Sequence, residues 1–284
     1  MNGVTDTEFF NYQISGAVGI ALKLYGRIDA DALLRGTSYL DNPRAADIRQ
    51  AAVELKDVKI HGCIMADEVG FGKTKQVLLA AYLHTILSKE EEDGELLFRP
   101  ILLVVPPTLI NQWLEELRSH WPCFRSVISY EDHEFKQEMA LSAISHTAMK
   151  EYPSLEALPR ELRYIFDKRD KKAGKTIIIT SYETHKGRTG KKKQRRIPGI
   201  PYKKPRYTKD GEPIWKKKPR IEKYWVTNHQ KVYSLLIADE AQKIKNYSSG
   251  TWSVLFCHNF PKTILATATP MFNSVRVSAS FISS

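Results

Sequence analysis

The chain has 284 residues, of which 42% are hydrophobic and 26% are charged, and its formal net charge at pH 7 is +11. This length and composition are ordinary for a globular protein of one large or two small domains. No apolar run approaches the ~20 residues of a membrane span, and the N-terminus, with Asp6 and Glu8, lacks the basic start of a signal peptide. Three widely spaced cysteines without C-x-x-C spacing argue against disulfides and a structural zinc site. We therefore expect an intracellular protein without a membrane partner.

An amphipathic helix is predicted near the N-terminus. Its face is marked by four apolar residues at helical spacing: Ile14, Ala17, Val18 and Ala21. Gln13 stands at the start of this helix, where one interpretation is a surface residue without a ligand. We expect residues 1–61 to form an extension that precedes a main domain at 62–284.

A glycine-rich segment at 66–74 follows an apolar run and precedes a helical pattern. In this arrangement, glycines let backbone N–H groups approach phosphate oxygens, and the N-terminus of the helix favours their negative charge. Lys73 would supply a charge for the β- and γ-phosphates, and Thr74 would offer a hydroxyl to Mg²⁺. Asp67 stands where the general G-x-x-x-x-G-K-[ST] pattern has glycine, so a Gly-Lys-Thr sequence on a surface turn is the alternative. The predicted ATP-binding residues are Asp67, Glu68, Val69, Gly70, Phe71, Gly72, Lys73 and Thr74.

Short apolar runs separated by helical or polar segments predict a parallel sheet. The predicted strands are 101–105, 127–130, 176–180, 235–238 and 263–267. After the first of them, four residues mark one face of a helix: Ile110, Trp113, Leu114 and Leu117. Crossover connections between parallel strands give an α/β fold, a mostly parallel sheet with helices on both faces.

The whole excess of positive over negative charge lies in one segment. Between Lys186 and Tyr224 there are 16 Lys and Arg residues and three acidic ones, a net charge of +13, against −2 for the remainder. Five prolines in this segment forbid a long helix or a central strand, so we expect a basic, disordered insertion at 186–229. Its interleaved cations and rings suit a nucleic-acid surface; the run 191–196 would equally serve as a nuclear-import signal, and a solvated loop without a ligand is the third interpretation. The DNA-binding candidates are Lys191, Lys192, Lys193, Arg195, Arg196, Lys216, Lys217 and Lys218.

Two adjacent carboxylates, Asp239 and Glu240, follow the predicted strand 235–238. Ligands of open α/β sheets bind at the carboxyl ends of the strands. Asp239 would hold Mg²⁺, and Glu240 would orient the attacking water and help to deprotonate it. With Lys73, these two residues form the predicted catalytic set, whereas the alternative is a helix start or a solvated turn.

In this order, the segments resemble the first RecA-like lobe of the Swi/Snf-type ATPases, the chromatin-remodelling and DNA-repair translocases of helicase superfamily two. The loop of that family commonly reads Asp-Glu-Met-Gly-Leu-Gly-Lys-Thr, which residues 67–74 match with two substitutions. Further similar segments are Tyr12-Gln13 with Gly16, 100–113, Thr180-Ser181-Tyr182-Glu183, 236–246, and Ala266-Thr267-Ala268-Thr269-Pro270 with Asn273.

The resemblance implies a RecA-like P-loop lobe that binds ATP and Mg²⁺, with Gln13 reading the adenine. It also implies that Gln242, Thr267 and Thr269 couple the nucleotide to DNA, either duplex or chromatin, and that the protein is nuclear. Gln242 stands where the family usually has His and Ala268 where it usually has Gly. Because His and Gln can each donate and accept hydrogen bonds, we expect Gln242 to bridge toward 266–270.

In this family a second RecA-like lobe follows, and 271–284 is too short to contain one. We therefore expect slow ATP hydrolysis by the chain alone, with other subunits or a separately encoded second lobe as partners. An arginine supplied to the γ-phosphate is typically worth ~10³ to 10⁵ in rate. The alternative is a catalytically inactive nucleotide- or DNA-binding remnant or adaptor. A P-loop kinase is a third interpretation, which leaves several motifs unexplained.

Overall fold

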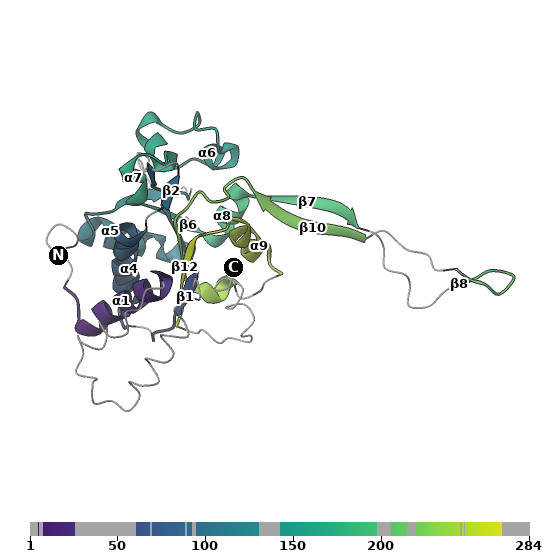
Figure 1. Ribbon diagram of the computed structural model, residues 1–284, viewed down its shortest axis with the longest axis horizontal. Helices are drawn as coiled ribbons and strands as arrows, with labels where there is room; N and C mark the ends of the chain where they lie inside the picture. The colour runs from purple at the N-terminus through teal and green to yellow at the C-terminus, as the bar shows by residue number, and fades with distance from the viewer. Residues whose placement is uncertain are drawn as a thin grey trace, which may run out of the picture.

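The core of the structure is a six-stranded sheet (Figure 1). Its strands are all parallel and follow the order β1-β12-β11-β4-β6-β5. The strands in that order are β1 (Gly62–Met65), β12 (Lys262–Ala266), β11 (Leu235–Asp239), β4 (Ile101–Val105), β6 (Thr176–Ser181) and β5 (Arg125–Ile128). This computed structural model describes residues 5, 8–25, 61–68, 70–88, 90–92, 95–130, 143–197, 206–214, 220–244, 246 and 248–268. The predicted α/β class with a mostly parallel sheet is confirmed.

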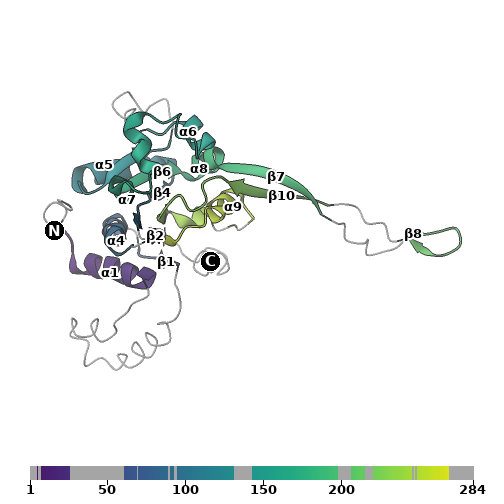
Figure 2. The same ribbon diagram turned by 45° about the horizontal axis from the view of Figure 1, so that its top comes forward.

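Helices cover both faces of the sheet, as predicted (Figure 2). On one face lie α1 (Asn11–Tyr25), α4 (Lys73–Leu87) and α5 (Ile110–His120), and on the other α6 (His146–Glu151), η4 (Arg160–Phe166), α8 (Tyr182–Thr189) and α9 (Gly250–Cys257). β4 shows why a continuous apolar run is needed: Ile101, Leu103 and Val105 enter one core, while Leu102 and Val104 enter the other. No helix in the described residues is long and apolar enough to cross a membrane.

Short elements complete the described chain. They are β2 (Glu90–Glu92), β3 (Glu95–Leu97), η2 (Pro107–Leu109), α7 (Lys171–Gly174), β8 (Arg206–Tyr207), β9 (Pro213–Ile214) and η5 (Ala241–Ile244). All three cysteines are free thiols.

The N-terminal helix α1 packs against α4 and joins the core of the main body. Ala17 and Ala21 are buried, as the predicted face requires, but the rest of the buried face differs. Val18 is 40% exposed, whereas Ile20 and Leu24 are buried beside Ala17. Residues three or four positions apart lie on the same face of a helix. The face of α1 that contains Ala17 therefore also contains Ile20 and Leu24, which lie nearer the end of the helix.

The basic segment contains a pair of strands that the sequence did not predict. β7 (Gly190–Ile197) and β10 (Arg220–Thr227) pair antiparallel, with Gly190 opposite Thr227, and project from the body (Figures 1 and 2). We call these residues the basic arm. The prediction of disorder is therefore wrong for the two ends of the insertion. All five prolines lie between the two strands in the sequence, one of them in β9, so none of them interrupts this ladder.

Trp225 anchors the arm to the body. A Cβ on Gly190 would lie 3.2 Å from its ring, and a Cβ on Gly250 would lie 2.7 Å from it. The Cys257 thiol donates to the Trp225 carbonyl at 3.3 Å. The two glycines therefore let the indole sit directly on the backbone at the start of α9.

Three buried histidines lie beside the base of the arm: His185 on α8, His229 after β10, and His258 at the end of α9. His258 donates from Nδ1 to the His229 carbonyl at 3.0 Å, so its Nε2 accepts from His185 Nε2 at 2.9 Å. Burial lowers the pKa of His229 to about 4 and that of His258 to about 3, and it lowers the pKa of His185 well below its usual value. All three are therefore neutral in the folded chain at pH 7.

This cluster predicts acid destabilisation. In the unfolded chain the histidines bind protons below about pH 6.5, whereas the folded chain resists protonation until about pH 4 or lower. The contribution of the cluster to the free energy of unfolding is therefore fully present above about pH 6.5, and it is lost as the pH falls through this window. His229→Gln should reduce the slope between about pH 6 and 5 by about 1.4 kcal/mol per pH unit, as measured by urea unfolding. A slope for His229→Gln equal to that of the parent would contradict the prediction.

Candidate functional site

The segment between β1 and α4 forms a tight loop whose glycines are required by its geometry. Gly72 has φ 66° and ψ 38°, and Gly70 has φ 93°, a region that residues with a Cβ rarely adopt. A Cβ on Gly72 would lie 2.1 Å from Gln13 Nε2, whereas a Cβ on Gly70 would meet nothing within 4 Å. Gly72 is therefore required for two reasons: it adopts the left-handed angles of the turn, and it leaves space for Gln13 of α1.

Lys73 is the first residue of α4, and its ammonium contacts the backbone of the loop. Nζ donates to the Asp67 carbonyl at 3.0 Å and to the Glu68 carbonyl at 2.8 Å. Asp67, which replaces the usual glycine, has a structural partner: its Oδ2 accepts from Gln76 Nε2 at 2.9 Å, and the same amide donates to the Phe71 carbonyl at 3.1 Å. Gln76 is buried and was not among the predicted site residues; its only signal in the sequence is its place one turn after Lys73.

Gln13 is 3% exposed and faces the loop, so its interpretation as a surface residue is wrong. Its Oε1 accepts from the Phe10 N–H at 3.1 Å, and its Nε2 lies against Gly72. Gly16, one turn later, has no room for a Cβ, which would lie 1.9 Å from Gln76 Oε1. Although α1 and the loop are far apart in the sequence, they therefore pack directly against each other.

Asp239 ends β11 and is held by three hydrogen bonds. Its Oδ2 accepts from Trp113 Nε1 at 2.9 Å, its Oδ1 accepts from the Glu240 N–H at 2.9 Å, and its carbonyl accepts from the Tyr182 hydroxyl at 2.6 Å. Burial raises the pKa of Asp239, while the bonds from Trp113 and the Glu240 backbone and the charge of Lys73 lower it. The carboxylate is therefore desolvated but well supplied with donors.

A chain of side chains links Glu240 to the end of β12. Gln242 donates from Nε2 to the Glu240 carboxylate, and its Oε1 accepts from the Thr267 hydroxyl at 2.7 Å. The Thr267 N–H donates to the Met65 carbonyl at 3.0 Å, at the end of β1. The expected bridge through Gln242 is present, and it connects the carboxylate pair to the strand that leads into the loop.

Strand register brings these segments to one edge of the sheet. Met65 and Asp239 are both paired with Ala266, from its two sides. The loop after β1, the carboxylates after β11 and Thr267 after β12 therefore begin at the same level. Among the described residues, no group of three or more His, Cys, Asp or Glu side chains could hold a metal ion. The hydroxyl of Thr74 and the carboxylate of Asp239 are hard oxygen donors of the kind that suits Mg²⁺ with nucleotide phosphates.

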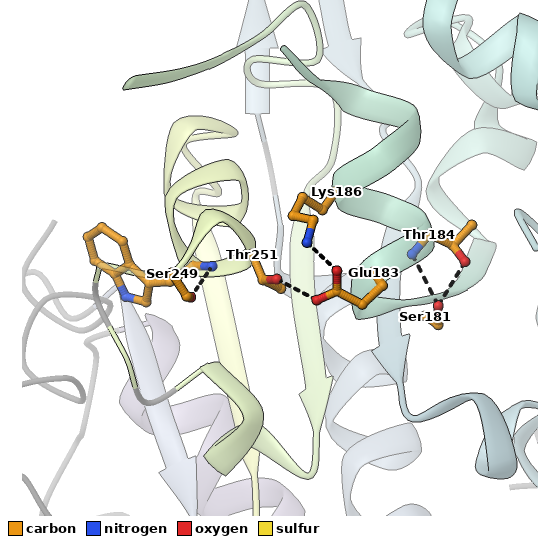
Figure 3. Close-up of polar contacts among 7 residues, drawn as sticks. Ser181, Glu183, Thr184, Lys186, Ser249 and Thr251 are labelled. Carbon is orange, nitrogen blue, oxygen red and sulfur yellow. Dashed lines mark hydrogen bonds and ion pairs between the residues drawn. The ribbon is translucent and has the colours of Figure 1, made fainter. Parts of the chain in front are cut away.

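Within residues 180–183, Ser181 and Glu183 make contacts at the start of α8. Ser181 caps the helix by accepting from the Thr184 N–H at 3.2 Å (Figure 3). Glu183 accepts from the Thr251 hydroxyl at 2.9 Å and pairs with Lys186, which lowers the pKa of the carboxylate (Figure 3). The N-terminal turns of α8 and α9 are thereby joined.

The described DNA-binding candidates lie along β7, away from the loop. Lys191, Lys192, Lys193, Arg195 and Arg196 are all exposed. Two of them contact rings of β10: the Lys192 ammonium lies 5.8 Å from the Trp225 ring centre, and the Arg195 guanidinium lies 5.6 Å from that of Tyr224. The other site candidates Val69, Lys216, Lys217, Lys218 and Thr269 lie outside the described residues, as do Pro270 and Asn273.

The loop geometry predicts different outcomes at its two glycines. Gly70→Ala adds only the left-handed backbone cost, about 1–2 kcal/mol. Gly72→Ala adds a comparable cost and also forces Gln13 away, so it should lower the free energy of unfolding further and loosen α1. Urea unfolding and hydrogen exchange of α1 measure both effects; equal stability of the two variants would contradict the contact.

Two DNA repair proteins are among the relatives that the chain matches. The mouse DNA repair and recombination protein RAD54-like is 23% identical over 215 residues, which cover 76% of this chain and 21% of that protein. DNA repair protein rhp54 of Schizosaccharomyces pombe is 21% identical over 217 residues, covering 76% and 19%. The chain thus spans about a fifth of the length of these two relatives.

One solved structure to which the chain is similar is the Sulfolobus solfataricus SWI2/SNF2 ATPase core in complex with dsDNA. The match has a TM-score of 0.47 and 17% identity, covering 98% of this chain and 36% of that one. A family model described as the SNF2-related domain matches residues 32–282. The protein therefore belongs to the SNF2-related domain family.

Proposed function

We propose that this chain is the ATP-binding lobe of a DNA-directed ATPase of the Swi/Snf type. The observation that carries the proposal is the convergence of the loop at 66–74, the pair Asp239 and Glu240, and Thr267 at one edge of the sheet. Glycines with left-handed backbone angles and a lysine at the start of a helix suit a triphosphate.

In this proposal each side chain has a distinct task. Lys73 exchanges its carbonyl partners in the loop for the β- and γ-phosphate oxygens. Thr74 and Asp239 would hold Mg²⁺, which, when bound, supplies charge neutralisation for phosphoryl transfer. Glu240 accepts a proton from the attacking water, and Gln242, bonded to that carboxylate, connects it to Thr267. The products are ADP and inorganic phosphate.

The proposed partner of the ATPase is DNA, as duplex or in chromatin, which places the protein in the nucleus. Support comes from the repair proteins that it resembles and from the exposed cations of the basic arm. As this chain covers only part of the length of its relatives, turnover in the whole protein is proposed to require a second RecA-like lobe.

The nucleotide site is tested by Lys73→Ala, with Lys75→Ala as the matched control. Lys75 lies on the same turn and contacts the Glu8 carbonyl, at 3.5 Å. Calorimetry should show at least about a 100-fold loss of Mg·ATP affinity for the first variant, since a charge-assisted phosphate contact is worth roughly 3 kcal/mol. The control should bind as the parent does. Parent-like binding by Lys73→Ala would contradict the loop assignment.

DNA-stimulated phosphate release separates the ATPase from a nucleotide- or DNA-binding protein without turnover. We expect release to be slow for the chain alone and to rise when a second lobe is supplied together with duplex DNA. Tight ATP binding without release under both conditions would favour the noncatalytic alternative.

Shortening the basic arm tests its role in DNA binding. Lys193 and Tyr224 are paired opposite each other, so an Asn-Gly turn can replace residues 194–223 and keep Trp225 in place. The shortened chain should bind duplex DNA more weakly. Its affinity should also depend less steeply on salt, by about 0.9 in the logarithmic slope for each phosphate that it no longer neutralises. Its ATP affinity, as the control, should match the parent. Unchanged DNA affinity and slope would leave the arm without this role.

A further inference from the structure

Two buried donors reach Asp239 from helices on opposite faces of the sheet. Trp113 lies on α5, which follows β4, and Tyr182 begins α8, which follows β6. The first is 3% exposed and the second 5%. On the basis of the proposed nucleotide site, we propose that Trp113 and Tyr182 are positioning residues that orient the Asp239 carboxylate toward the metal ion of a bound nucleotide.

Trp113 acts on one carboxylate oxygen directly. Its indole N–H donates to Asp239 Oδ2 at 2.9 Å, and an indole can only donate. Each carboxylate oxygen can accept about two bonds, so this contact fixes the oxygen and still leaves it able to bind a cation. The indole is packed in the core beneath α5, so the donor has a defined position.

Tyr182 acts on the other oxygen through the backbone. Its hydroxyl donates to the Asp239 carbonyl, and this carbonyl belongs to the same planar peptide unit as the Glu240 N–H. That N–H donates to Asp239 Oδ1 at 2.9 Å. Holding the carbonyl therefore also holds the N–H that orients the carboxylate.

The backbone at this point needs such support. Glu240 has φ 52°, in the left-handed region that is uncommon for residues with a Cβ. The Tyr182 bond stabilises the peptide plane that enters this turn. Both oxygens of Asp239 are thus oriented, one from each face of the sheet, before a ligand arrives.

Removal of such outer partners typically costs 10- to 100-fold in metal affinity. Trp113→Phe and Tyr182→Phe each remove a donor and keep an aromatic ring. In the full 284-residue chain, binding of a fluorescent ATP analogue is followed during a Mg²⁺ titration and, separately, in EDTA. We expect the Mg²⁺ midpoint to rise at least about 10-fold in each variant, while the affinity in EDTA stays at the parent value because the loop contacts are intact.

Matched controls are available for both substitutions. Trp121→Phe removes an indole N–H that donates to Glu116 at 3.3 Å, just beyond the end of the same helix. Tyr233→Phe removes a fully buried hydroxyl that has no hydrogen-bond partner among the described residues. Both controls should keep the parent Mg²⁺ midpoint. If the midpoint instead depended on aromatic packing in general, the controls would raise it as well.

Parent-like midpoints in the folded Trp113→Phe and Tyr182→Phe variants would overturn the inference. If Trp113→Phe fails to fold, Tyr182→Phe, which differs from the parent by one oxygen atom, decides the outcome alone. Failure of the parent chain to bind the analogue would instead contradict the proposed nucleotide site, and this inference with it, so the two failures are distinguishable.

Discussion

The register of three parallel strands determines where everything else in the site lies. β12 pairs with β1 on one side and with β11 on the other, and Ala266 is the common partner of Met65 and Asp239. Since neighbouring strands lie about 4.8 Å apart, the ends of β1 and β11 are separated by roughly 10 Å. The segments that leave these strands therefore start level and close together, at the edge where ligands of α/β sheets bind.

Hydrogen bonds convert this coarse alignment into a defined arrangement. Gln76 ties Asp67 to the loop, Trp113 and Tyr182 fix Asp239, and Gln242 connects Glu240 with Thr267. Partly or fully buried polar groups are costly unless each finds a partner, so these contacts both stabilise and specify the conformation. Packing of α1 adds a further constraint because Gln13 occupies the space beside Gly72.

The sequence was most informative where a local pattern reports the structure. The run at 101–105 could be placed because both faces of β4 are buried, and the loop could be placed because glycines and a lysine follow a strand. Trp113 could be placed on an amphipathic helix and in a segment similar to a family motif, but its contact with Asp239 could not be predicted because it spans 126 residues of sequence. Tyr182 was quoted only within a segment similar to a family motif, because its bond to the Asp239 carbonyl spans 57 residues. Gln76 contacts Asp67 only nine residues away, but the spacing of apolar residues in its helix does not report such a polar contact.

The strands of the basic arm escaped prediction for a different reason. Lysine and arginine occupy both faces of β7, so the alternation that marks a half-buried strand is absent. Pairing depends instead on β10, which supplies Tyr224 and Trp225 as partners for the cations. The histidine cluster likewise combines residues from three separate elements, each unremarkable in its own segment.

The central claim is that the loop and the carboxylate pair bind one nucleotide together. The most direct test is a crystal structure of the 284-residue chain grown with ADP and Mg²⁺. We predict the β-phosphate within the loop, with Lys73 Nζ moved from the carbonyls of Asp67 and Glu68 to phosphate oxygen, and the metal ion between Thr74 and Asp239. Nucleotide bound elsewhere, or Lys73 still bonded to those carbonyls beside an ordered nucleotide, would contradict this claim.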